Sequence, residues 1–273
     1  MPTSIGFERL SPTIGGEVTG IDLRTVSDDD TLAALRAGLL EHKVIFFRDQ
    51  DITTEQHIAF ARCFGELEIH PVTPLDQPNP EVLVIRHDEN RRGSENTWHS
   101  DVTWRPEPSL GSILRSRVVP DVGGDTLFAD MHAAFESLPD KVRHQVDGLT
   151  AIHDFTRVFG FGLDAKAQQE MMARHPPVEH PVIRTHPETG RKGIYVNAAF
   201  TVAIKGMGDT ESARLLRTLY RQAGAPELQC RFRWRVNSLA FWDNRSTQHY
   251  AVSDYHPAVR EMERVTVAGD KPF

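Results

Sequence analysis

Three residues at two separated places in the sequence have the types and spacing of a metal site. His99 and Asp101 lie two residues apart, and His249 follows about 150 residues later. Two imidazoles and one carboxylate can form a 2-His-1-carboxylate triad, which occupies one face of Fe(II) and leaves the opposite coordination positions open. A co-substrate and O2 can bind at those open positions. The pattern therefore predicts non-haem iron chemistry.

The short spacing of the first two ligands predicts their local structure. Side chains at i and i+2 of a β-strand point to the same face, so His99 and Asp101 can reach one ion while Ser100 points away. The pair alone is weak evidence, because a chain with 13 histidines contains such patterns by chance. We therefore expect a strand at this position. Further evidence for a metal site must come from another residue that could bind a co-substrate beside the metal.

Arg260, eleven residues after His249, is a candidate for such a residue. Its planar, permanently charged guanidinium suits bidentate binding of a carboxylate. The segment from Tyr250 to Val259, with His256-Pro257, indicates a strand end and a loop before a final strand at Arg264–Ala268. Arg260 is accordingly either a carboxylate-binding residue or half of a buried structural ion pair.

The periodicity of apolar residues indicates a mainly β chain with flanking helices. Helical spacing follows Ser27-Asp28, the capping box Thr53-x-x-Gln56, and Asp209-Thr210. Short alternating or apolar runs predict strands over 43–47, 82–86, 111–119, 126–129, 150–155, 181–185, 193–196, 229–234 and 239–243. Many short strands with a few helices are typical of a sandwich or barrel with helices packed outside.

Length and composition narrow the class of protein. The 273 residues are 39% hydrophobic and contain no linker or repeat, so we expect a single domain over 1–273. The formal net charge of −7 argues against a nucleic-acid-binding surface. The N-terminus has no basic stretch followed by an apolar segment, and no run of about 18 apolar residues occurs, so we expect a soluble cytoplasmic protein without membrane contact.

Several motifs in order along the chain resemble the taurine dioxygenase family of Fe(II)/2-oxoglutarate-dependent dioxygenases. The similarity begins at Ile14–Gly20 and ends at Gly269–Phe273. The motifs between these ends are Trp98-His99-Ser100-Asp101-Val102-Thr103, Gly123-Gly124-Asp125-Thr126-Leu127, His180–Pro187, Trp242-Asp243-Asn244-Arg245-x-Thr247-Gln248-His249 and Arg260-x-Met262-x-Arg264-Val265-Thr266.

This resemblance implies a double-stranded β-helix (jelly-roll) core and assigns roles to the matching positions. It places Fe(II) on His99, Asp101 and His249, the distal carboxylate of 2-oxoglutarate on Thr126 and Arg260, and O2 at the vacant coordination position. A charged and a neutral donor suit one carboxylate. The resemblance implies that 2-oxoglutarate is decarboxylated to succinate and CO2 while a substrate carbon is hydroxylated. The segment near 156–178, which contains Gly160-Phe161-Gly162, is expected to be a lid-like insertion over the mouth of the site.

The same resemblance points to a small anionic substrate. His70 and Arg264 match the positions that hold the sulfonate in taurine enzymes, whereas Thr73 and Glu95 replace a Tyr and an Asn. Glu95 would repel a nearby sulfonate unless it paired with a substrate ammonium or with Arg264, so taurine itself is in doubt. Sulfonates, sulfate esters and aryloxyalkanoates are the expected classes. When the hydroxylated carbon carries a heteroatom, the product collapses to an aldehyde or ketone and releases the leaving group.

Side chains at three further positions are expected to provide an apolar wall for any of these substrates: Val102, Phe159 and Phe200. Family members are commonly homo-oligomers, so the resemblance also implies a dimer or tetramer. A jelly-roll Zn(II) hydrolase or a non-catalytic small-molecule sensor is the alternative, because one fold hosts many functions. Against the hydrolase, Arg260 and Thr126 would have no task, and the sequence contains no Gly-x-Ser-x-Gly motif.

Overall fold

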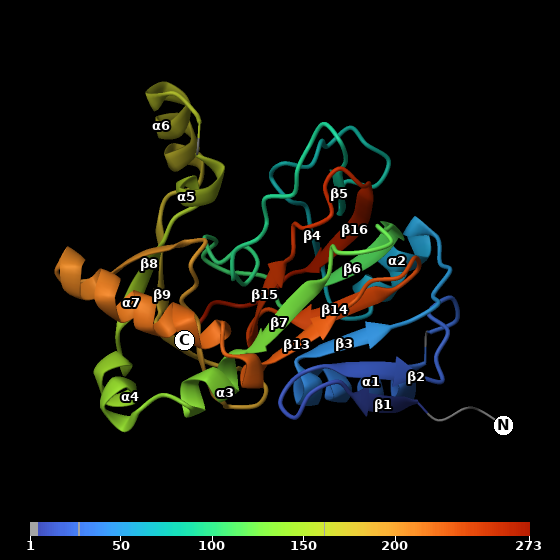
Figure 1. The fold of residues 1–273 in the computed structure, drawn as a ribbon, viewed down its shortest axis with the longest axis horizontal. Helices are drawn as coiled ribbons and strands as arrows, with labels where there is room; N and C mark the ends of the chain where they lie inside the picture. Colours follow the sequence, from blue (N-terminus) through green and yellow to red (C-terminus); the bar gives the residue numbers. More distant parts are fainter. Residues whose placement is uncertain (1–4, 27, 161) are drawn as a thin grey trace.

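The computed structural model describes residues 5–26, 28–160 and 162–273, and its main feature is a pair of facing β-sheets (Figure 1). The larger sheet has eight strands in the order β1-β2-β3-β14-β6-β16-β4, with β5 also paired to β16. The smaller sheet has the order β13-β7-β15. The strands of these two sheets are β1 Gly6–Arg9, β2 Gly16–Thr19, β3 Val44–Phe47, β4 Leu67–Glu68, β5 Val82–His87, β6 Gly111–Val118, β7 Thr126–Asp130, β13 Gln229–Phe232, β14 Leu239–Asp243, β15 Thr247–Ala251 and β16 Arg260–Val267.

Alternation along β3 shows how the two faces of the large sheet are buried. Val44 and Phe46 belong to a core cluster with residues of the smaller sheet, and the Phe46 ring lies 5.5 Å from that of Phe128. Ile45 and Phe47 belong to a second cluster on the opposite face. Because successive side chains point to opposite faces, a fully apolar strand predicts burial on both sides.

Two helices cover the outer face of the large sheet, α1 (Asp29–His42) and α2 (Thr54–Arg62). The side chain of Asp28 caps α1, while Ser27 lies outside the described residues. The capping box of Thr53 and Gln56 at α2 is confirmed. The apolar stripes predicted for both helices therefore serve core packing.

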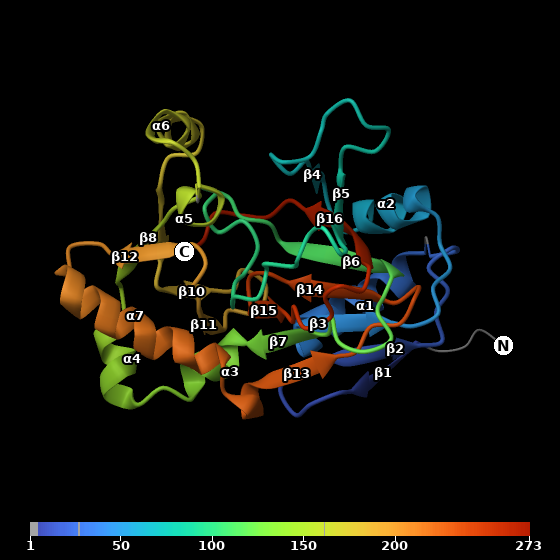
Figure 2. The same cartoon turned by 45° about the horizontal axis from the view of Figure 1, so that its top comes forward.

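A second group of elements lies beside the smaller sheet (Figures 1 and 2). It contains a sheet of order β12-β8-β9, the hairpin β10-β11, and a shared apolar cluster. Its strands are β8 Thr150–His153, β9 Val178–Pro181, β10 Ile183–Thr185, β11 Lys192–Ile194 and β12 Thr201–Ile204. Its helices are α3 Met131–Glu136, α4 Asp140–Val146, α5 Thr156–Phe159, α6 Ala165–Arg174, α7 Asp209–Ala223 and the 3₁₀ helix η1 Pro226–Leu228.

These sheets confirm the mainly β jelly-roll prediction. The last strand differs from the prediction, because β16 begins at Arg260 and not at Arg264. Cross-strand pairing with β5 extends to the pair Arg260 and His87, so the strand continues where the sequence suggested a loop. No helix of the described residues has both the length and the apolar character needed to cross a membrane.

Candidate active site

His99 and His249 lie side by side, although about 150 residues separate them in the sequence. Their backbones form an isolated antiparallel bridge, in which His99 N–H donates to His249 O at 3.1 Å and His249 N–H donates to His99 O at 2.8 Å. The ring centroids are 4.2 Å apart. This single bridge places the His99 imidazole beside that of His249, the central residue of β15.

Asp101 lies in a turn, so the predicted strand geometry of His99 and Asp101 is wrong. The backbone N–H of Asp101 donates to Asn244 Oδ1 at 3.1 Å, and no strand partner continues beyond His99 among the described residues. Ser100 still points away, since its hydroxyl donates to Thr247 O. Asn244 is a tertiary contact from a distant segment, and local spacing could not predict it.

The carboxylate of Asp101 is held on both oxygens. Ser112 donates to Oδ2 at 2.7 Å, and Arg264 Nη1 donates to Oδ1 at 2.8 Å. Burial acts to raise the pKa of Asp101, but the positive charge of Arg264 and the two neighbouring imidazoles hold it well below its usual range. The site therefore presents an ionised carboxylate between two histidines.

The donor atoms of His99, Asp101 and His249 fit a metal ion. One ligand atom from each lies within 4.8 Å of the others. His99 Nδ1 lies 2.7 Å from Thr97 O, which fixes the proton on Nδ1 and leaves Nε2 free as a ligand. Burial, and then the charge of His99, lower the pKa of His249 to about 3, so its imidazole is neutral as a ligand requires.

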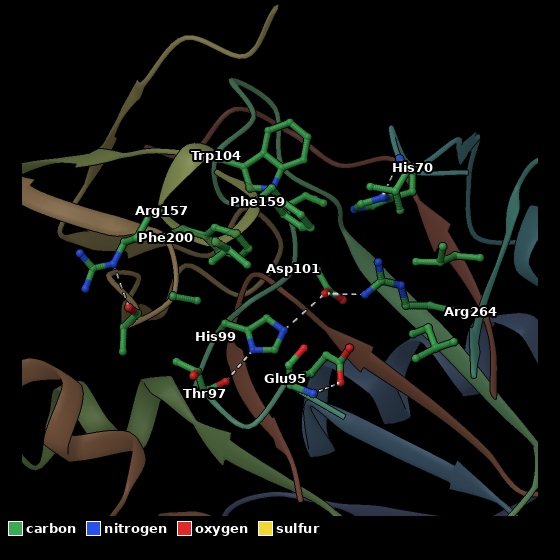
Figure 3. A pocket seen from close by; sticks show the side chains of 18 of the residues that line it. His70, Glu95, Thr97, His99, Asp101, Trp104, Arg157, Phe159, Phe200 and Arg264 are labelled. Carbon is green, nitrogen blue, oxygen red and sulfur yellow. Dashed lines mark hydrogen bonds and ion pairs between the residues drawn. The ribbon is translucent and has the colours of Figure 1, made fainter. Parts of the chain in front are cut away.

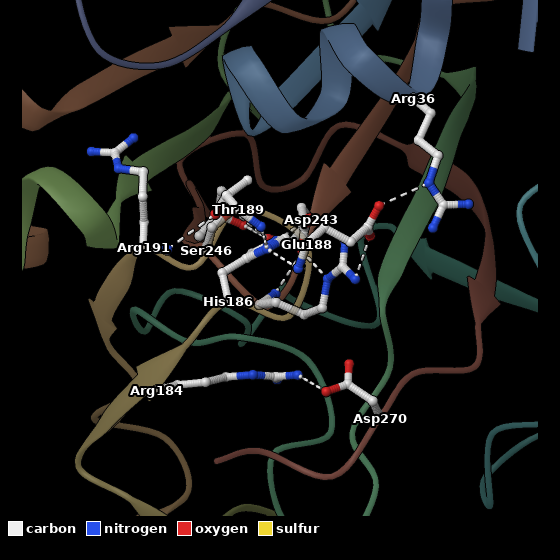
Figure 4. Close-up of polar contacts among 11 residues, drawn as sticks. Arg36, Arg184, His186, Glu188, Thr189, Arg191, Asp243, Ser246 and Asp270 are labelled. Carbon is white, nitrogen blue, oxygen red and sulfur yellow. Dashed lines mark hydrogen bonds and ion pairs between the residues drawn. The ribbon is translucent and has the colours of Figure 1, made fainter. Parts of the chain in front are cut away.

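The loop between β14 and β15, which leads into the strand that carries His249, contains a buried ion network (Figure 4). Asp243 accepts from Arg245 Nε at 2.8 Å and lies 3.0 Å from His186 Nε2. Arg245 Nη1 continues to Glu188 at 2.8 Å. Asp243 is 1% exposed, and a charge buried to this extent needs such partners.

A cavity of about 720 Å³ opens next to the triad (Figure 3). Three aromatic rings, Trp104, Phe159 and Phe200, line one side of it, and the His70 ring lies 6.0 Å from Phe159. Arg264 lines the cavity as well. The structure brings six of the seven predicted substrate residues to this wall: His70, Glu95, Val102, Phe159, Phe200 and Arg264. The volume lies in the range of small-molecule sites.

Arg264 and His70 make one end of the cavity suited to an anion. Arg264 uses Nη1 for Asp101, and its buried Nε has no hydrogen-bond partner among the described residues. Burial and then the Arg264 charge lower the pKa of His70 to about 4, so the imidazole is neutral. Its Nδ1 accepts from Val72 N–H at 3.3 Å, which leaves Nε2–H as a donor.

Glu95 and Thr73 behave differently from each other. Glu95 lines the cavity, but its Oε1 lies 3.4 Å from His87 Nε2 and makes no ion pair with Arg264 among the described residues. Thr73 is buried behind the wall and does not line the cavity; its N–H donates to His70 O at 2.8 Å. Thr73 therefore supports the His70 loop in this structure.

Arg260 and Thr126 form a separate polar group beside the triad. Arg260 Nε donates to Gly124 O at 3.1 Å, and Trp234 Nε1 donates to the Thr126 hydroxyl at 3.0 Å. The guanidinium centre of Arg260 lies 6.0 Å from the Trp234 ring. Arg260 is 4% exposed and has no carboxylate partner within ion-pair distance among the described residues, which favours a ligand carboxylate over the structural ion pair.

Sequence reasoning missed several apolar residues of the cavity. Trp104 and the β5 residues Leu83, Val84 and Ile85 line it. In the sequence these β5 residues have the pattern of any half-buried strand. Their position near the triad depends on the pairing of β5 with β16, which no local feature of the sequence shows. The three residues between Asn197 and Thr201 also line the cavity; of these, Phe200 was predicted, and Ala198 and Ala199 were not.

The sequence matches the family described as "Taurine catabolism dioxygenase TauD, TfdA family" over residues 6–266. It is 37% identical to an "Alpha-ketoglutarate-dependent sulfate ester dioxygenase" of Pseudomonas putida, over 95% of this chain and 88% of the relative. It is 35% identical to an "Alkylsulfatase" of Acinetobacter baylyi, over 97% and 85% of the two chains.

Solved structures agree with the sequence match. A taurine dioxygenase from Burkholderia xenovorans superposes with a TM-score of 0.85 at 38% identity, covering 98% of this chain and 91% of the other. AAD-2 in complex with Mn(II) and N-oxalylglycine superposes with a TM-score of 0.83 at 32% identity, covering 98% and 99%.

These matches remove the alternatives of a zinc hydrolase and a sensor, because the family and its similar relatives are dioxygenases. They confirm the resemblance seen in the motifs and the oxidoreductase class. The chain belongs to the TauD, TfdA family, and it is a 2-oxoglutarate-dependent dioxygenase that uses Fe(II) and O2.

Proposed function

We propose that this dioxygenase hydroxylates the carbon next to the ester oxygen of an alkyl sulfate. The observation that carries the proposal is the cavity, which joins an anion-binding end at Arg264 and His70 to an apolar wall beside the triad. A sulfate ester has the same two parts, an anionic head and an apolar tail. The names of the two relatives described above, a sulfate ester dioxygenase and an alkylsulfatase, support this substrate class.

His99, Asp101 and His249 would hold Fe(II), because two imidazoles and one carboxylate suit that ion. When bound, the iron supplies the activation of O2 that couples 2-oxoglutarate decarboxylation to oxidation of a substrate C–H bond. The protein groups around it do the positioning: Ser112 and Arg264 fix both oxygens of Asp101. Thr97 fixes the tautomer of His99.

Arg260 and Thr126 would bind the distal carboxylate of 2-oxoglutarate. Arg260 is charged, buried and free of a protein carboxylate among the described residues, and the Thr126 hydroxyl is 2% exposed beside Trp234. Trp234 already donates to the Thr126 oxygen, so the hydroxyl proton is available to a carboxylate. One charged and one neutral donor would then meet the two oxygens.

At the other subsite, the Arg264 guanidinium and His70 Nε2–H would donate to the sulfate oxygens. The tail would lie against Phe159, Phe200 and Val102, where burial of each methylene contributes about 0.8 kcal/mol. Glu95 lines the cavity, but its Oε1 lies 3.4 Å from His87 Nε2, so it would be shared with that imidazole. Taurine, a short zwitterion, would leave most of this wall uncovered.

The overall reaction balances without another reductant. One oxygen atom of O2 enters succinate as 2-oxoglutarate loses CO2, and the other enters the C–H bond of the carbon that carries the ester oxygen. The resulting hydroxy sulfate ester breaks its C–O bond, giving an aldehyde and hydrogen sulfate. The leaving sulfate lies beside Arg264 and His70, which stabilise its charge.

An assay with Fe(II), 2-oxoglutarate and a series of alkyl sulfates tests the proposal. We expect sulfate and succinate in equal amounts, with kcat/KM rising about threefold to fourfold for each added methylene until the wall is filled. Taurine and 2,4-dichlorophenoxyacetate serve as comparison substrates. If no alkyl sulfate released sulfate while one of those two gave coupled succinate, the substrate class would be wrong and the reaction class would stand.

Four wider proposals accompany this function. We propose that residues 1–273 fold as one domain, which a single cooperative unfolding transition would support. The segment 156–178, in which Phe161 lies outside the described residues, would act as a lid, because Val158 and Phe159 of α5 line the cavity. The enzyme would be a cytoplasmic homo-oligomer, either a dimer or a tetramer. Light scattering and cell fractionation test these last two points.

A further inference from the structure

The backbone directly after the metal ligand Asp101 is strained. Val102 has φ 47°, in the left-handed region, where a β-branched residue is a genuine outlier. Its side chain is buried and lines the cavity. Such a conformation persists only where surrounding contacts enforce it, and it commonly occurs at functional sites. The contacts that enforce it here are therefore candidates for positioning residues.

The strongest contacts are those of the next residue, Thr103. Its side chain is fully buried, and its hydroxyl accepts from Asn197 Nδ2 at 3.0 Å and lies 3.0 Å from His153 Nδ1. His153 and Asn197 are also fully buried. None of these three residues lines the cavity.

The direction of each hydrogen bond follows from the available protons. Asn197 Oδ1 accepts from Phe200 N–H at 2.9 Å, so the amide nitrogen of Asn197 is the end that donates to Thr103. The Thr103 hydroxyl proton is then free to be donated to His153 Nδ1. His153 consequently carries its proton on Nε2, which lies 3.3 Å from the Thr201 hydroxyl.

This small network joins three segments that line the cavity. Asn197 belongs to the turn that carries Ala199 and Phe200, and His153 ends β8 just before α5. The turn and β8 are also linked by the Asp154 N–H, which donates to Phe200 O at 2.9 Å. Thr103 thus lies where the metal-ligand turn, the Phe200 turn and the base of the lid meet.

We propose that the Thr103 hydroxyl, held between His153 and Asn197, is a positioning group that fixes the strained Val102 turn against the substrate wall. Asp101 has its own anchors in Asn244, Ser112 and Arg264, so loss of the Thr103 hydroxyl displaces the wall more than the metal ligand. The effect on the substrate rests on the proposed function, whereas the effect on the turn does not.

Two matched pairs of variants test this positioning role in the Mn(II)-loaded protein. Thr103→Val keeps the shape and removes the hydroxyl, and Thr103→Ser keeps the hydroxyl. His153→Asn places an acceptor near the Nδ1 position that faces Thr103, and His153→Gln places its polar group toward Thr201. We expect amide hydrogen exchange in 101–105 and 197–200 to accelerate in Thr103→Val and His153→Gln, and to remain near wild type in Thr103→Ser and His153→Asn.

The same variants are then assayed with octyl sulfate. We expect Thr103→Val to raise KM for octyl sulfate roughly tenfold and to reduce the ratio of sulfate to succinate, with 2-oxoglutarate and Mn(II) affinities unchanged. Thr103→Ser should keep the wild-type ratio.

Wild-type hydrogen exchange and wild-type KM in Thr103→Val would overturn the proposal. If that variant does not fold, equal hydrogen exchange rates in the two His153 variants would overturn it. Failure of the wild-type enzyme to release sulfate would reject the alkyl sulfate proposal alone, because hydrogen exchange still reports on the turn.

Discussion

Arg260 and Arg264 lie four residues apart on β16 and share one face of the strand, yet their surroundings differ. Arg264 donates to the carboxylate of Asp101 at 2.8 Å, whereas Arg260 donates to the Gly124 carbonyl at 3.1 Å and has no carboxylate within ion-pair distance among the described residues. Burial lowers the pKa of Arg260, and Tyr255 and Glu95 partly offset this effect. This difference agrees with the two tasks proposed above, in which Arg264 would join the metal ligand to the substrate and Arg260 would bind a carboxylate from outside the protein.

We expect the largest loss of activity from removing the carboxylate of Asp101, the ion-pair partner that Arg264 has and Arg260 does not. Asp101→Ala removes one of three metal ligands and leaves Arg264 without a carboxylate, as Arg260 is now. We expect succinate formation to fall by about a thousandfold or more, and Mn(II) binding measured by EPR to be lost. His99→Ala and His249→Ala should behave in the same way.

Replacement of the exposed His144 on α4 provides the control for these variants, and it should keep wild-type turnover. Asp101→Glu is a milder change, since its carboxylate is retained on a longer side chain. Near-normal turnover in any of the three Ala variants would contradict the triad assignment.

The next largest effect should come from Arg260. Loss of a charge-assisted contact costs roughly 1.5–3 kcal/mol, so Arg260→Ala should raise the 2-oxoglutarate requirement about 10- to 100-fold. Binding of the sulfate ester should change far less. Titration of 2-oxoglutarate into the anaerobic Fe(II) protein measures this shift. An unchanged affinity would show that Arg260 has a structural role.

Arg264 should give the opposite pattern. Arg264→Ala leaves the Arg260 group intact and should therefore retain 2-oxoglutarate binding, while KM for octyl sulfate rises roughly tenfold or more. Slow 2-oxoglutarate decarboxylation should persist without matching sulfate release. Arg264→Lys keeps the charge and loses the planar fork, so it should fall between wild type and Ala. If Arg264→Ala weakened 2-oxoglutarate binding as much as octyl sulfate binding, the proposed difference between the two arginines would be wrong.

The sequence predicted these residues with uneven success, and the reason is physical. The three metal-ligating residues could be predicted because their chemistry depends on residue type and on motifs that are local in the chain, and the structure brings their donor atoms together. The role of Arg260 stays a prediction. The geometry of the metal ligands could not be predicted, because Asn244 and not a neighbouring strand holds the backbone of Asp101. Likewise, the pairing of Arg260 with His87 of β5 extends β16 beyond its predicted start. Long-range contacts of this kind leave no local periodicity.

The cavity wall shows the same limit. Phe159 and Phe200 were expected to form part of an apolar wall, and both line the cavity. Trp104 and Ile85 were not expected, because an apolar residue in a turn or a strand has the same appearance whether it faces a core or a substrate. Thr73 matched a substrate position in the family, but the structure places it behind the His70 loop.

We expect the smallest effect from replacing Glu95. This replacement shows whether the Glu95 charge acts mainly on Arg260 or on Arg264. The sequence suggested repulsion of a substrate anion at Arg264, whereas in the structure Glu95 contacts His87 and its charge acts on the pKa of Arg260. Because a negative charge near Arg260 opposes binding of a dicarboxylate, Glu95→Gln should lower the 2-oxoglutarate requirement about twofold to fivefold, with little change in KM for octyl sulfate. Glu89→Gln, on an exposed residue of the same loop, should change neither value. A lower KM for octyl sulfate with an unchanged 2-oxoglutarate requirement would instead assign Glu95 to the Arg264 subsite.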